Sequence, residues 1–199
     1  MKKGFSIILV LILVISGTLM IGGNVFSASS ENKYVEDGTR AFNQALWNEF
    51  TKADDVDNFF TGLTTEKQEA LIEMLTPVKC ESITTVSKAR GQKTVYQMTT
   101  YKGPLGGTLF EYCMQLEWGY DNVIITEIYD RHSWGNTYWG YQHDALSESE
   151  SGGVGNIFFK SVNRSEFCLS LGGRVISITK PWIDITVDQN GGYNISTGE

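Results

Sequence analysis

The sequence predicts a mainly β fold, α+β overall, in which an antiparallel β-sandwich of about eight or nine strands follows a short helical segment. Three observations support this prediction. Apolar residues recur at helical spacing from Asp37 to Leu75. After Cys80 the apolar residues alternate with polar ones, as in half-buried strands. Turn residues separate these later stretches without any helical pattern between them, which excludes a parallel α/β fold.

The helical segment divides into three short helices. Asp54 and Asp55 precede the second helix, where a carboxylate can cap free backbone N–H groups. Thr65 and Gln68 have the spacing of a capping box for the third helix, and Pro77 ends it. The apolar faces of the first two helices are Phe42, Ala45, Leu46 and Phe50, and then Val56, Phe59, Phe60 and Leu63. Helices this short need a packing partner to persist.

The strands follow in close succession. The clearest is Phe110 to Trp118, where apolar and polar residues alternate along the whole stretch. Asn190 and Gly191 supply the positive-φ residues of a tight hairpin turn near the end of the chain. The stretch 147–155, rich in Ser, Glu and Gly, predicts an exposed flexible loop. Strands are predicted at 82–88, 94–101, 110–118, 123–129, 137–146, 156–163, 165–171, 174–180 and 182–187.

Residues 1–28 have the features of a secretory signal peptide. Lys2 and Lys3 precede an apolar run at 7–15, and small residues follow near position 28. The run is shorter than the ~20 residues that a membrane span needs. We therefore expect a secreted protein with no stable membrane insertion after signal cleavage, a helical segment at 29–78 and a sandwich domain at 79–199.

The charge of the chain limits its partners. Removing Lys2 and Lys3 with the signal peptide lowers the count of basic residues from 16 to 14, against 23 acidic residues, which leaves a formal charge of −9. A chain this acidic is repelled by phosphate backbones and by anionic lipid surfaces unless it carries a separate basic patch, and the sequence has no cluster of Lys or Arg. Nucleic acid is therefore not expected as a partner.

Three cysteines in an oxidising compartment allow at most one internal disulfide. Cys113 and Cys168 both lie in predicted strands beside polar neighbours, and we predict that they form this bond. Three reduced and buried thiols are an equal alternative. No base or electropositive setting near any of these cysteines indicates a catalytic thiol.

Three stretches of the β region resemble those of a group of known proteins. They are FEYCMQLEWGYDNVIITE at 110–127, SESGG at 149–153 and PWIDITV at 181–187. They look like stretches of small exported β-rich proteins from Gram-positive bacteria that are uncharacterised. This resemblance implies a bacterial extracellular setting, and it supplies no functional residues.

The stretch HSWGNTYWGYQHD from His132 to Asp144 holds both histidines of the chain. If residues 133–136 form a hairpin turn, the two imidazoles lie ~20 Å apart, so one metal ion cannot bind both. The same register places a candidate ligand-binding set on one sheet face: Asp130, His132, Trp139 and Tyr141. An aromatic ring beside a carboxylate and an imidazole can stack on a sugar and hydrogen-bond its hydroxyl groups. The alternative is that the aromatic residues belong to the core and that polar side chains line the sheet edge beside them.

No catalytic motif or cofactor fingerprint occurs in the sequence, so no cofactor is expected and an enzyme is disfavoured. Acidic residues on separate strands could still converge as in a glycoside hydrolase; the candidates are Glu111, Glu117, Glu127 and Asp184. The sequence favours a secreted module that binds an extracellular glycan or a cell-wall component. The main alternative is a bacteriocin-like antagonist, a toxin whose helices engage a target or membrane.

Overall fold

The computed structural model describes the backbone from residue 37 to residue 199 and the side chains from residue 42 onward. The predicted signal peptide lies outside the described residues. Within them, three helices precede nine strands. The helices are α1 (Asp37–Phe50), α2 (Val56–Thr61) and α3 (Thr65–Met74). The strands are β1 (Lys79–Ala89), β2 (Gln92–Lys102), β3 (Thr108–Tyr120), β4 (Ile125–Thr137), β5 (Tyr141–Gly152), β6 (Phe158–Leu171), β7 (Arg174–Thr179), β8 (Trp182–Asp188) and β9 (Tyr193–Gly198).

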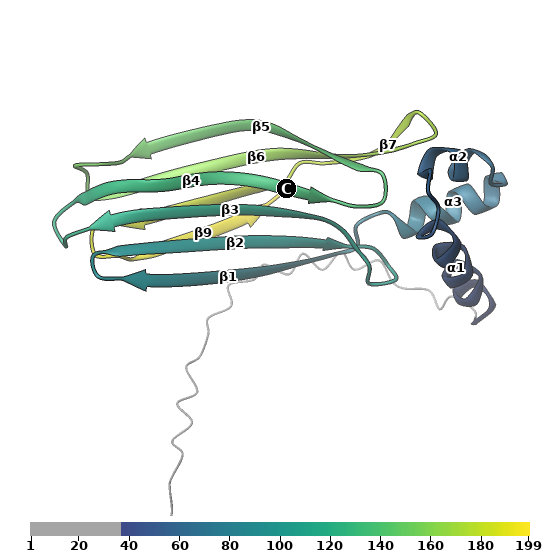
Figure 1. Ribbon diagram of the computed structural model, residues 1–199, viewed down its shortest axis with the longest axis horizontal. Helices are drawn as coiled ribbons and strands as arrows, with labels where there is room; N and C mark the ends of the chain where they lie inside the picture. The colour runs from purple at the N-terminus through teal and green to yellow at the C-terminus, as the bar shows by residue number, and fades with distance from the viewer. Residues whose placement is uncertain (1–36) are drawn as a thin grey trace, which may run out of the picture.

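The strands form two antiparallel sheets that face each other (Figure 1). The four-stranded sheet has the order β1-β2-β3-β4. The five-stranded sheet has the order β5-β6-β8-β9, and β7 pairs with β6 as well. The predicted β-sandwich is confirmed, and so is the short helical segment that precedes it.

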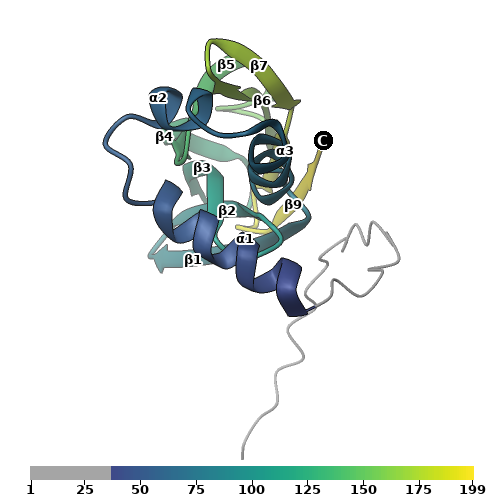
Figure 2. The ribbon, with the colours of Figure 1, turned by 90° about the vertical axis from the view of Figure 1, so that its right-hand side faces the viewer.

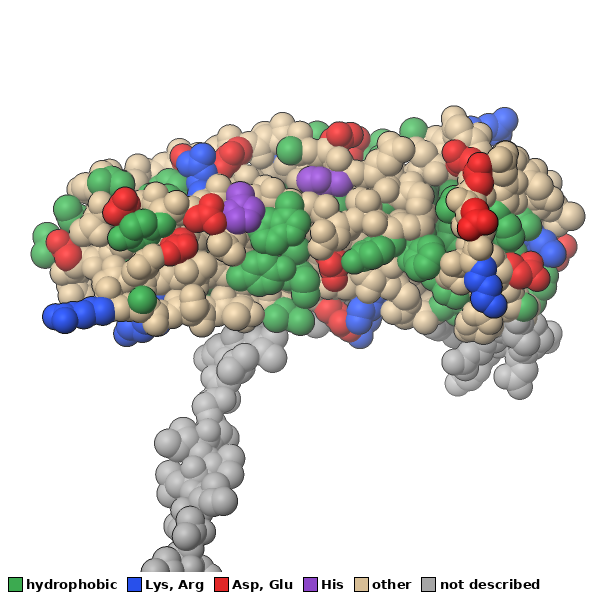
Figure 3. All heavy atoms as spheres, viewed as in Figure 1, with side chains coloured by type: hydrophobic (Ala, Val, Ile, Leu, Met, Phe, Trp, Pro, Cys, Tyr) green, Lys and Arg blue, Asp and Glu red, His purple; other side chains and the backbone are tan. Residues whose placement is uncertain are grey.

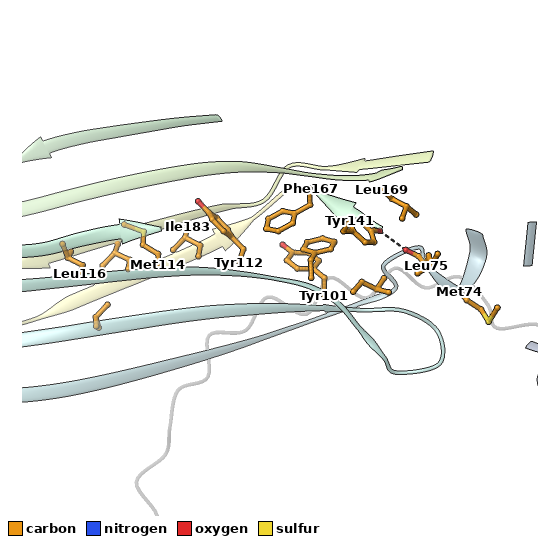
Figure 4. Packing of buried hydrophobic residues seen from close by; sticks show 14 of the residues in the cluster. Met74, Leu75, Tyr101, Tyr112, Met114, Leu116, Tyr141, Phe167, Leu169 and Ile183 are labelled. Carbon is orange, nitrogen blue, oxygen red and sulfur yellow. Dashed lines mark hydrogen bonds between the residues drawn. The ribbon is translucent and has the colours of Figure 1, made fainter. Parts of the chain in front are cut away.

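Alternation of side chains builds the core between the sheets. In β3, Phe110, Tyr112, Met114, Leu116 and Trp118 are all buried, because every second side chain of the strand points toward the five-stranded sheet. In β8 the buried residues are Ile183, Ile185 and Val187. Rings also join the two sheets directly: Phe110 stacks on Phe167 of β6, with 4.3 Å between the ring centroids. Figure 4 shows this row of buried side chains.

The three helices cover one end of the sandwich (Figure 2). They bury most of the apolar faces that the sequence predicts, but Phe42 and Ala45 of the predicted α1 face are exposed. The buried helical residues are Leu46, Phe50, Phe60, Leu71, Met74 and Leu75. Asp55 caps α2 as predicted, accepting a hydrogen bond from the backbone N–H of Asn58 at 2.9 Å. The capping box of α3 is not formed, because Gln68 donates instead to the Phe60 carbonyl at 2.9 Å.

The strands β4, β5 and β6 differ clearly from their predicted bounds, and β4 is described with the candidate site below. β6 runs without a break from Phe158 to Leu171, where the sequence predicts two strands. Its middle residues Ser161, Asn163 and Ser165 face inward and are buried. Because these inward residues are polar, the alternating sequence pattern breaks there and does not show that the strand is continuous. Residues 147–152, predicted as a loop, belong to β5 and pair with β6. The alternating Ser and Glu residues there follow the two faces of a strand.

Candidate functional site

The structure separates the four predicted ligand-binding residues into two pairs. Trp139 and Tyr141 lie at the junction with the helices. The Trp139 ring packs edge-on against Trp47 of α1, with 5.5 Å between centroids, and its Nε1 donates to the Thr108 carbonyl at 3.0 Å. Tyr141 is buried. Asp130 and His132 lie on β4, far along the sheet from that junction. The prediction that these four residues share one surface is therefore wrong.

The error comes from the predicted turn at residues 133–136. These residues continue β4, and the chain turns only at 138–140, where Trp139 adopts a positive φ of 56°. β4 and β5 then enter different sheets, so they do not form a hairpin. Gly135 is a point of close approach within the strand. A Cβ atom there would lie 2.6 Å from atoms of His143 and Phe167 in the opposite sheet.

Asp130 and His132 instead belong to an aromatic cluster on the outer face of the four-stranded sheet, the face turned away from the five-stranded sheet. The pairing register places Tyr96, Gln115 and His132 in one row across β2, β3 and β4. The adjacent row runs from β1 to β4 and consists of Ile83, Met98, Cys113 and Trp134. We call Tyr96, Met98, Gln115, Asp130, His132 and Trp134 the outer aromatic face.

The rings of this face lie against one another. His132 stacks on Trp134, with 4.7 Å between centroids and an angle of 20° between the ring planes. Tyr96 contacts Trp134 at a centroid distance of 5.7 Å. All three side chains remain partly or largely accessible to solvent. Figure 3 shows a hydrophobic patch on the visible face, with one of the two histidines at its margin. The outcome is an aromatic surface several rings wide on a rigid sheet.

A fixed carboxylate borders these rings. One oxygen of Asp130 accepts a hydrogen bond from Gln115 Nε2 at 2.9 Å, and the other lies 3.1 Å from Nδ1 of His132. The hydrogen bond from His132 lowers the pKa of Asp130, so its carboxyl group stays ionised at neutral pH. Asn136 donates to Glu111 at 3.0 Å further along the same face. The rings are thus flanked by oriented hydrogen-bonding groups.

Cys113 lies beneath this surface and is fully buried. The Tyr96 hydroxyl donates to its Sγ atom at 3.2 Å, and burial raises the pKa of the thiol. Cys168 lies in β6 between the inward-facing Phe167 and Leu169, so it points to the outer face of the other sheet. The predicted Cys113–Cys168 disulfide is not formed, because the two thiols point away from each other. All three cysteines, including the exposed Cys80, are free.

A serine and a histidine meet inside the sandwich without forming a reactive pair. Nε2 of His143 lies 3.0 Å from Oγ of Ser165. Ser165 is only 1% exposed, so no substrate can reach its hydroxyl group. Burial lowers the pKa of His143 and keeps the ring neutral, and no carboxylate hydrogen-bonds to it among the described residues. The pair therefore serves the packing of the core.

Of the four acidic residues considered for glycoside hydrolysis, Glu117 and Glu127 both lie near Tyr129 on the outer face of the four-stranded sheet, whereas Glu111 and Asp184 lie apart from them. Glu111 and Glu117 lie on the outer face of β3, six residues apart, which corresponds to ~20 Å along a strand. Asp184 lies on the outer face of the other sheet and pairs with Lys160, with 2.6 Å between Oδ2 and Nζ. Among the described residues, no group of three or more His, Cys, Asp or Glu side chains is placed to hold a metal ion.

The sequence analysis missed Trp134 and Tyr96, the two largest side chains of the outer aromatic face. Tyr96 lies in a predicted strand, but the pattern there is misleading, because the buried residues Gln97 and Thr99 are polar while Tyr96 faces outward. Trp134 was assigned to a turn. No family model, no curated protein and no solved structure matches this chain. The resemblance to small exported proteins of Gram-positive bacteria therefore stays a prediction.

Proposed function

We propose that this protein is an extracellular binding module that recognises a glycan through the outer aromatic face. The observation that carries the proposal is the stack of Tyr96, Trp134 and His132 on an exposed sheet face beside the fixed carboxylate of Asp130. A group of large rings that stays partly accessible on a rigid outer surface favours a binding site.

The chemistry of the face fits a sugar ring. A pyranose has an apolar face of C–H groups, which can lie on Trp134 or Tyr96, and a rim of hydroxyl groups. Asp130 can accept hydrogen bonds from such hydroxyls, while Gln115 can both donate and accept. A β-sheet presents these groups on a flat surface. An extended polysaccharide chain or a cell wall therefore fits this surface better than a small ligand, which would need an enclosed pocket.

The proposed setting rests on the N-terminal sequence. Residues 1–28 predict export, and a cell-wall polysaccharide is a partner that an exported bacterial protein meets. Within the described residues, none of the helices combines the length and apolarity needed to cross a bilayer.

Binding can be tested with purified mature protein, insoluble polysaccharides and isolated cell walls in a co-sedimentation assay. We expect Trp134→Ala to weaken binding about tenfold or more, since a central aromatic residue commonly contributes most of the affinity of a site. Asp130→Asn should weaken binding less, because the amide keeps one acceptor oxygen.

Trp182→Ala is the matched control. Trp182 is also half-buried, but it lies on the outer face of the other sheet, against Gly198 of β9. Equal loss of binding in both tryptophan variants would refute the assignment of the site, as would unchanged binding in Trp134→Ala. Failure of wild-type protein to bind any polysaccharide or cell wall would refute the glycan proposal itself.

The alternative of an antagonistic toxin acting through its helices gains no support from the packing. The apolar faces of α1 and α3 are turned into the core, where Phe50, Leu71 and Leu75 are at most 1% exposed. Helices that engage a target with these faces would first have to leave the sandwich. A growth-inhibition assay on neighbouring strains tests this alternative separately.

A further inference from the structure

The end of the sandwich opposite the helices carries a second surface. It consists of four turns, at residues 88–93, 120–125, 152–158 and 188–193, which lie together at the left end of the molecule in Figure 1. We call these residues the tip. Val123, Val154 and Ile157 are 68%, 61% and 61% exposed there, so three β-branched aliphatic side chains stand in solvent at one end.

The turns of the tip are joined to one another by backbone hydrogen bonds. Ile125 donates to the Asn156 carbonyl at 2.7 Å, and Gly155 donates back to the Ile125 carbonyl at 2.9 Å. Asn122 donates to the Gln189 carbonyl at 2.9 Å, which ties the turn at 188–193 to the turn at 120–125. The aliphatic side chains are therefore held in place, and their exposure is a fixed property of the fold.

Carboxylates further fix the turns. Asp121 accepts hydrogen bonds from the backbone N–H groups of Val123 and Ile124, both at 2.9 Å. Asp188 accepts from those of Asn190 and Gly192 at 2.8 and 2.7 Å. The hydrogen bonds to Asp121 lower the pKa of its carboxyl group.

The charge of the tip differs from that of the rest of the molecule. The tip holds three basic residues, Lys88, Arg90 and Lys93, against the two acids Asp121 and Asp188. The helical end, residues 42–76, holds seven acids against two lysines, and the whole chain has a formal charge of −7. In Figure 3 hydrophobic side chains lie at the left end, with an acidic side chain beside them and basic side chains at the lower corner. Lys88 and Arg90 are exposed and form no ion pair with any described residue.

We infer that the tip docks peripherally on a phospholipid bilayer that contains anionic lipids. Three aliphatic side chains on rigid turns can enter the headgroup region together, while Lys88 and Arg90 contact lipid phosphates. A convex end presents its apolar residues to a flat surface, and the acidic helical end faces away from the lipid. This contact is independent of the outer aromatic face, which lies along the side of the sandwich.

The inference is tested by co-sedimentation of the full mature protein with vesicles of phosphatidylcholine mixed with phosphatidylglycerol. The double variant Val154→Asp with Ile157→Asp should bind about tenfold or more weakly, because two exposed aliphatic groups no longer leave water on docking. The control is Val175→Asp, since Val175 is 61% exposed as well but lies in β7 beside the helical end. This control should bind as the wild type does.

A second measurement does not depend on loss of binding. Val123→Trp places a fluorophore on the tip, and its emission should shift to the blue when mixed vesicles are added, whereas Val175→Trp should not respond. Absence of vesicle binding by the wild type, or undiminished binding by the double variant, would overturn the inference. Equal binding to vesicles without phosphatidylglycerol would overturn the role given to Lys88 and Arg90.

Discussion

Among the contacts that attach the helices to the sandwich is one buried hydrogen bond that can be removed cleanly. Tyr141 of β5 donates its hydroxyl to the backbone carbonyl of Leu75 at 2.8 Å (Figure 4). Leu75 caps the C-terminus of α3 and is fully buried, so water cannot replace this donor. Burial raises the pKa of Tyr141, which keeps the phenol protonated and able to donate.

Tyr141→Phe removes the hydroxyl and keeps the ring. The variant leaves the Leu75 carbonyl buried without a partner, which costs about 1–3 kcal/mol of unfolding free energy. With a urea m-value of about 2 kcal/mol/M, typical of a small domain, a loss of about 2 kcal/mol lowers the urea midpoint by about 1 M. Urea unfolding followed by circular dichroism and by tryptophan fluorescence measures this shift.

Tyr129→Phe is the matched control, because Tyr129 is 50% exposed, so water can replace any hydrogen bond that its hydroxyl group forms. Its urea midpoint should equal that of the wild type. If Tyr141→Phe also unfolds at the wild-type midpoint, the hydroxyl does not hold the helices in place. The same variant should leave glycan binding unchanged, which separates the structural role of Tyr141 from the binding role that the sequence suggests.

Three further outcomes are expected. Gly135→Ala should lower the unfolding free energy by about 1–3 kcal/mol, since its Cβ would overlap the rings packed against the glycine; a wild-type urea midpoint would contradict this. Because burial lowers the pKa of His143, the unfolded chain takes up a proton that the folded chain resists, so stability should fall as the pH drops from about 7 to about 5, and less so in His143→Gln. Thiol labelling with mass spectrometry should find three free thiols in the unfolded protein, with Cys80 labelled rapidly and Cys113 protected in the native state.

The sequence was sufficient for the fold because its strongest local patterns agree with the tertiary structure. The helical spacing at 37–75 and the alternation at 110–118 both describe faces that the structure buries. The predicted hairpin forms, since β8 ends at Asp188 and β9 begins at Tyr193, but only Gly191 has the predicted positive φ, at 75°, and Asn190 does not. Each of these signals depends on neighbours in the chain.

The outer aromatic face could not be predicted from such local sequence patterns. Its rows combine side chains of four strands, and their register depends on where β4 ends. The assignment of residues 133–136 to a turn rested on a glycine that in fact makes room for His143 and Phe167 of the opposite sheet. Sequence spacing alone does not distinguish a turn glycine from a glycine required by close packing.

β4 also reverses the usual distribution of side chains over the two faces of a strand. Its inward positions near the middle are Arg131, Ser133 and Gly135, of which Arg131 forms an ion pair with Glu148 across the sandwich edge at 2.7 Å. Its outward positions include His132 and Trp134. A pattern that expects apolar residues inside therefore assigns this strand wrongly. The place where the local rule fails coincides with the proposed binding surface.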